Sequence, residues 1–84
     1  MNRVLPDEGF HEAARAFALD LATGPTKAHA ATKEVVRTAM AEGVRAADDR
    51  VAVLAGQLFA TEDNRNAVRS FLDEGPGKAS YVGR

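Results

Sequence analysis

The residues best suited by type to bind a phosphate lie near the C-terminus, in the segment Gly75-Pro76-Gly77-Lys78-Ala79-Ser80. A P-loop requires a further glycine, separated from its Gly-Lys pair by four residues, and a Ser or Thr directly after the lysine. Leu72 and Ala79 occupy those two places. A dinucleotide-binding loop would need a preceding strand, whereas this segment follows a helical pattern. We therefore interpret it as the end of a helix followed by a turn.

The histidines and acidic pairs do not form a recognisable catalytic or metal-binding pattern. His11 and His29 lie on different predicted helices, and a zinc site needs three or four convergent ligands. Asp48-Asp49 and Glu62-Asp63 are adjacent pairs, and helical neighbours point about 100° apart, so a pair cannot flank one bond as acid and base. Capping and solvation explain these carboxylates, and we expect no catalytic residue, metal site or resident cofactor.

A basic stripe of Lys27, Lys33 and Arg37 is the strongest candidate for contact with nucleic acid. Acidic Glu34 interrupts it, and no aromatic residue lies between for base stacking. The net charge is −1 and the pI is about 6.1, so no positive field favours a phosphate backbone. The stripe is interpreted as a solvated helix face, and a helix-turn-helix DNA-binding role is disfavoured.

Length and composition predict one small helical domain spanning residues 1–84. Hydrophobic residues make up 45% of the chain, aromatic residues only 6%, and there is no cysteine. The lack of cysteine fits a reducing compartment, and no apolar run approaches the roughly 20 residues of a membrane span. We expect a soluble, cytoplasmic protein without a membrane partner.

Apolar spacing predicts an all-α fold of about four helices. The first ends at Gly24-Pro25, the second runs from about Pro25 to Met40, and the third from about Val44 to Ala60. Thr61 caps the fourth, which Gly75-Pro76-Gly77 ends. The positions expected to face inward are Phe10, Ala13, Ala14, Phe17, Ala18, Leu21, Ala28, Thr32, Val35, Val36, Ala39, Val44, Ala47, Val51, Leu54, Ala55, Leu58, Ala67, Val68, Phe71 and Leu72.

The third predicted helix carries apolar residues on more than one side. Ala46, Ala52 and Val53 lie partly off its main stripe, which favours coverage on two sides and a partner subunit. Gly56 lies within this pattern, where a glycine lowers helix stability by up to ~1 kcal/mol relative to alanine. A close approach by another backbone would explain a glycine there.

Several motifs in order resemble the C-terminal region of the enoyl-CoA hydratase/isomerase (crotonase) family. They are Asn2-Arg3-Val4-Leu5-Pro6, Gly24-Pro25-Thr26-Lys27-Ala28 with Lys33 following, Leu58-Phe59-Ala60-Thr61-Glu62-Asp63, Ala67-Val68-Arg69-Ser70-Phe71-Leu72 and Tyr81-Val82-Gly83-Arg84. Each motif alone is weakly specific. The Phe-Ala-Thr-Glu-Asp stretch, the Phe-Leu pair and the Gly-Arg ending are fairly specific together.

The resemblance implies a helical region that packs subunits into trimers or dimers of trimers. For this chain we expect a homo-oligomer, either a dimer or a trimer. Full members of the family hydrate or isomerise enoyl-CoA thioesters in fatty-acid metabolism. Their N-terminal core of ββα units holds the backbone amides and glutamates that act on the thioester. The resemblance therefore implies a fragment or truncated member that is inactive alone and acts in oligomerisation.

The resemblance also assigns one contact by position. The phenylalanine that matches Phe71 lies, in some members, beside the adenine end of CoA bound to a neighbouring subunit, where a lysine three residues later assists. Glu74 stands at that lysine's place here, and Lys78 is the nearest replacement cation. We favour packing in the helical core as the role of Phe71 over this contact, and the two roles need not exclude each other.

A function of another class is compatible with the same residues. Small helical domains often expose an apolar patch to a separate protein. The chain is then a free-standing interaction module with no enzymatic role.

Overall fold

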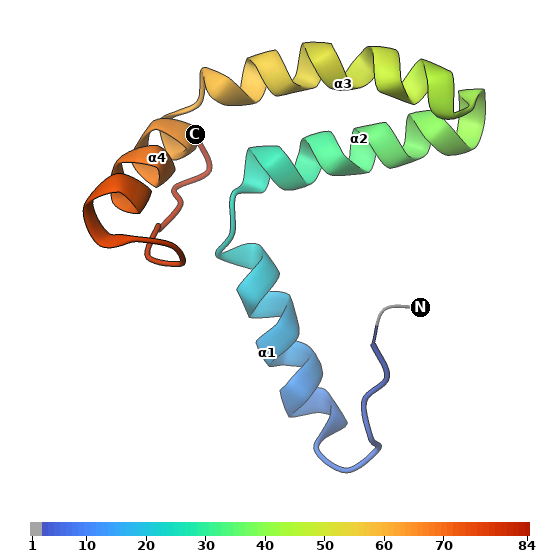
Figure 1. The fold of residues 1–84 in the computed structure, drawn as a ribbon. Helices are drawn as coiled ribbons and strands as arrows, with labels where there is room; N and C mark the ends of the chain where they lie inside the picture. Colours follow the sequence, from blue (N-terminus) through green and yellow to red (C-terminus); the bar gives the residue numbers. More distant parts are fainter. Residues whose placement is uncertain (1–2) are drawn as a thin grey trace.

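The computed structural model describes residues 3–84 as four α-helices joined by short turns, with no strand in that range (Figure 1). The helices are α1 (Phe10–Ala22), α2 (Thr26–Glu42), α3 (Val44–Phe59) and α4 (Glu62–Glu74). The predicted all-α architecture is confirmed. Within the described range, every helix is too short or too polar to cross a membrane. Asn2, the first residue of the resembling motifs, lies outside the described residues.

The helix ends follow from local residue chemistry. Gly43 has φ 97° between α2 and α3, and Gly75 has φ 85° after α4, a backbone region that disfavours side chains with a Cβ. Pro25 precedes the first residue of α2 as its N-cap. Thr61 caps α4 through its side chain, as predicted.

Helices α2 and α3 form an antiparallel pair that holds the small buried core (Figure 1). Ala47 is 3% exposed and Leu54 is 6% exposed, and both project from α3. Arg50 Nε of α3 donates to Glu34 Oε1 of α2 at 2.6 Å. An ion pair at this degree of exposure contributes at most about 1 kcal/mol, so apolar packing dominates the pairing.

Helix α1 extends away from the α2–α3 pair, so its apolar face is uncovered (Figure 1). Phe10 is 45% exposed and Phe17 is 44% exposed, with the Arg3 guanidinium carbon 5.4 Å from the Phe17 ring centre. The expectation that this face packs inward within the chain is wrong for residues 3–84. The radius of gyration is 15.8 Å, against about 12 Å for a compact domain of this length.

Several other positions predicted to face inward are also exposed. The prediction that they face inward is wrong for Ala18, Leu21, Thr32, Val36, Val44, Val51, Val68, Phe71 and Leu72. Helical periodicity places them on apolar sides of their helices, but the neighbouring elements within residues 3–84 cover these side chains only in part. A Cβ at Gly56 would meet no atom within 4 Å, so the expected close backbone approach is also not found there.

Candidate functional site: the corner of α3, α4 and the C-terminal tail

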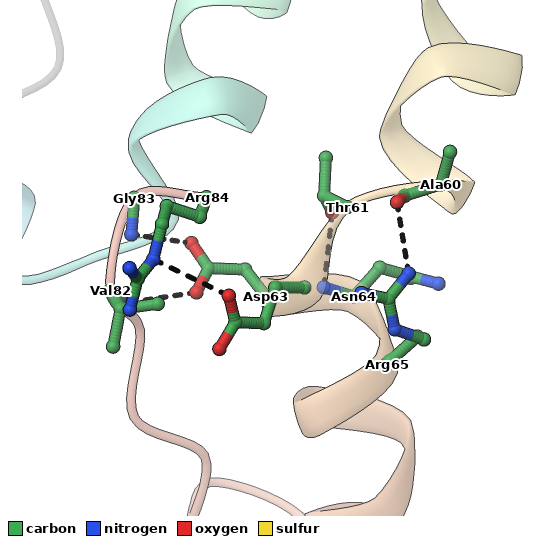
Figure 2. A network of polar contacts seen from close by, with 9 residues as sticks. Ala60, Thr61, Asp63, Asn64, Arg65, Val82, Gly83 and Arg84 are labelled. Atoms are coloured by element: carbon green, nitrogen blue, oxygen red, sulfur yellow. Dashed lines mark hydrogen bonds and ion pairs between the residues drawn. The ribbon is translucent and has the colours of Figure 1, made fainter.

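The corner between α3 and α4 is organised by Thr61. Its side-chain oxygen accepts a hydrogen bond from the Asn64 backbone N–H at 3.1 Å and donates to the Leu58 carbonyl at 2.7 Å. The Asn64 amide group donates to the Phe59 carbonyl at 3.3 Å. Arg65 donates to the Ala60 carbonyl at 3.1 Å (Figure 2). These bonds satisfy groups that the end of one helix and the start of the next leave without helical partners.

Replacing Thr61 with alanine removes the side-chain cap of α4. We expect Thr61→Ala to lower the free energy of unfolding by about 1 kcal/mol, measured by urea denaturation followed by circular dichroism. Thr32→Ala is the matched control, because Thr32 is exposed within α2 and bonds only the Ala28 carbonyl of its own helix. An equal loss in both variants would contradict a capping role for Thr61.

Asp63 joins the start of α4 to the end of the chain. Its carboxylate accepts the Val82 N–H at 2.7 Å and the Gly83 N–H at 2.9 Å. Figure 2 shows both of these bonds. The backbone N–H of Asp63 donates to the Arg84 carbonyl at 2.8 Å. The residue is only 4% exposed, so the interpretation of Asp63 as a solvated carboxylate is wrong. Burial without these donors would leave a carboxylate uncompensated.

Two further contacts hold the tail in place. Arg84 Nε lies 3.3 Å from Glu62 Oε2 in an exposed ion pair. Gly83 has φ 83°, and a Cβ there would lie 3.8 Å from the Thr26 hydroxyl oxygen at the start of α2. The tail therefore lies between the first turns of α4 and α2.

An apolar pocket of about 340 Å³ opens beside this corner. Helices α2, α3 and α4 and the tail all contribute to its wall, with Lys27 and Asn64 adding polar groups. Its apolar lining includes Ala28, Leu58 and Tyr81. Thr61 and Asp63 also line it, but their side-chain oxygens already take part in the hydrogen bonds of the corner, so the remaining, mostly apolar surface suits an apolar group.

The two residues that the resemblance assigns to CoA lie apart from this pocket. Phe71 is 59% exposed on α4, so packing in the core of this chain does not describe it. Lys78 lines a shallower cleft with Arg69, Asp73 and Glu74. Two cations and two carboxylates in one cleft nearly cancel, which weakens any attraction for a phosphate. Phe71 does not line that cleft.

The structure keeps the two histidines separate. His11 lies edge-on to Phe10 on α1, with ring centres 5.7 Å apart. The His29 side chain on α2 turns back towards Gly24, and its Nε2 is buried without a hydrogen-bond partner in residues 3–84. Across the described part of the chain, no three His, Asp or Glu side chains converge as metal ligands.

Comparison with known proteins identifies no relative. No protein-family model, curated protein or solved structure matches the chain.

The sequence did not predict the hydrogen bonds that join Asp63 to the tail residues Val82 and Gly83. The sequence indicates an acidic first turn of α4 and a glycine near the C-terminus, both of which the site uses. Neither signal says that the tail returns to α4. That pairing depends on the path of residues 75–84, for which helical periodicity offers no information.

Proposed function

We propose that this chain is a helical association module of the enoyl-CoA hydratase/isomerase type, which packs subunits together and carries out no chemistry by itself. The parent reaction would be the hydration or isomerisation of enoyl-CoA thioesters. The resemblance of the ordered motifs supports the family. The large uncovered apolar surface supports association.

The exposed area is the observation that carries the proposal. The chain exposes 6866 Å², whereas a folded monomer of 8.9 kDa is expected to expose about 4,800 Å². The excess is about 2,000 Å², and a specific interface of ordinary size covers about 800 Å² on each partner. The uncovered surface is therefore large enough for an extensive interface.

The apolar residues in this excess lie on several helices. Phe17 on α1, Phe59 on α3 and Leu72 on α4 are 44%, 70% and 76% exposed. Val53 is 49% exposed beside Gly56, where a Cβ would meet open space. A second helix can approach α3 closely there, as the two-sided apolar pattern predicts.

Light scattering of the purified chain across a concentration series tests the proposal. Association predicts a weight-average mass that rises from 8.9 kDa towards that of a dimer or trimer. A constant monomer mass, with helicity retained by circular dichroism, would contradict self-association and favour a separate protein as the partner.

The CoA contact of the parent family is a second part of the proposal. An exposed Phe71 is free to stack on adenine, and base–aromatic stacking contributes about 1–3 kcal/mol. We expect Phe71→Ala to weaken CoA binding to the associated chain by about 5- to 160-fold in calorimetric titration. Lys78→Ala should have a smaller effect because Asp73 and Glu74 share its cleft.

Met40→Ala is the control for the titration, since Met40 is an exposed apolar residue on α2, away from the helix that carries Phe71. It should leave CoA affinity unchanged. Undiminished CoA affinity in Phe71→Ala, or no CoA binding by the unaltered associated chain, would contradict the contact.

A further inference from the structure

We propose that residues 78–84 form a releasable strap that closes one wall of the apolar pocket, and that the Asp63 carboxylate is its latch. The strap is a conformational device within one chain. It requires neither a second copy nor CoA.

The strap is extended and has little apolar surface of its own to bury. It contains neither helix nor strand, and its residues alternate between exposed and half-buried from Lys78 to Arg84. This period of two is that of an extended segment lying on a surface. Only Ala79, Tyr81 and Gly83 face inward, so apolar contact alone holds the strap weakly.

Polar contacts at one point therefore account for most of the attachment. The bonds from Val82 and Gly83 to the Asp63 carboxylate, at 2.7 and 2.9 Å, and from Asp63 N to the Arg84 carbonyl, at 2.8 Å, all involve one residue of α4. On release, water can replace each partner, so the net preference for the latched strap is much smaller than the gross strength of these bonds, although the latched state remains the predominant one. A latch of this kind can open without unfolding the helices.

Tyr81 connects the latch to the pocket. It is half-buried, lines the pocket, and directly precedes Val82, the first donor to Asp63. Release of Val82 and Gly83 would move Tyr81 off the pocket. The wall formed by α2, including the half-buried Ala28, would then be more exposed to solvent.

A single engineered thiol can measure this opening because the chain has no cysteine. Ala28→Cys places the thiol on the α2 wall of the pocket, and the probe is iodoacetamide. Adding Asp63→Asn leaves one acceptor oxygen and turns an NH₂ group towards a backbone N–H. We expect the labelling rate to rise at least about tenfold, in keeping with the loss of a charge-assisted hydrogen bond.

Asp49→Asn in the same Ala28→Cys background is the matched control, since Asp49 is exposed on α3, does not line the pocket or the cleft beside the strap, and undergoes the same charge change. It should leave the rate unchanged. Tyr81 supplies an independent readout, because it is the sole tyrosine and the chain has no tryptophan. Its fluorescence quenching by iodide should increase with Asp63→Asn and not with Asp49→Asn.

If Asp63→Asn lowers helicity, Val82→Pro offers a second test, because it weakens the latch by a change in the tail instead of in α4. It removes one donor to Asp63 and alters no helical residue. Faster labelling with unchanged circular dichroism would support the strap. Unchanged labelling and unchanged Tyr81 quenching in a folded variant would overturn it, whatever the mass of the chain in solution.

Discussion

Leu54→Ala is expected to unfold most of the α2–α3 pair. Leu54 is 6% exposed and is the large apolar side chain in the buried core of residues 3–84. The other buried apolar residue of that core is Ala47. Removing a buried leucine costs about 2–5 kcal/mol. A single core in a chain of this size rarely supplies more than about 3–5 kcal/mol, so one substitution can remove nearly all of it.

Circular dichroism during urea denaturation, at one protein concentration, measures the effect. Leu72→Ala is the control, because the same atoms are removed from a side chain that is 76% exposed. We expect a change within about 0.5 kcal/mol for the control. Comparable losses in both variants would show that Leu54 does not anchor the core.

The double substitution Phe10→Glu and Phe17→Glu is expected to weaken self-association at least about 100-fold. Burying a phenylalanine contributes about 1.5–3 kcal/mol, and each 1.4 kcal/mol changes a dissociation constant about tenfold. Both rings are nearly half exposed on α1. The isolated chain should therefore keep its α2–α3 core while losing the partner contact.

Sedimentation velocity across a concentration series measures that change, with circular dichroism as the check on folding. Ala16→Glu is the control, since Ala16 is exposed on α1 and lies outside its predicted apolar stripe. It introduces the same type of charge without removing an aromatic ring. If the double variant associates as strongly as the unaltered chain, the α1 face is not part of the interface.

The helices were predictable because their causes are local. Apolar spacing indicated each of them, and Thr61 and Gly75 mark the start and end of α4 as predicted. The third helix was expected to end near Ala60 and ends at Phe59. Backbone hydrogen bonding within a helix joins residues four apart, so a short window of sequence contains most of the information.

The covered faces were not predictable in the same way. Phe17 and Leu54 both occupy apolar positions of a helical pattern, yet one is 44% exposed and the other 6%. Periodicity identifies an apolar face, but another element must lie against that face to bury it. The path of α1 away from the α2–α3 pair decides the difference.

The sequence by itself therefore determined the secondary structure and the character of each helix face, through spacing, capping and glycine placement. Only the tertiary structure decided that Asp63 is buried and binds Val82 and Gly83, which are 19 and 20 residues away. A carboxylate in a first helical turn is equally consistent with solvation and with burial. The return of the tail to α4 supplies the backbone donors that make burial possible.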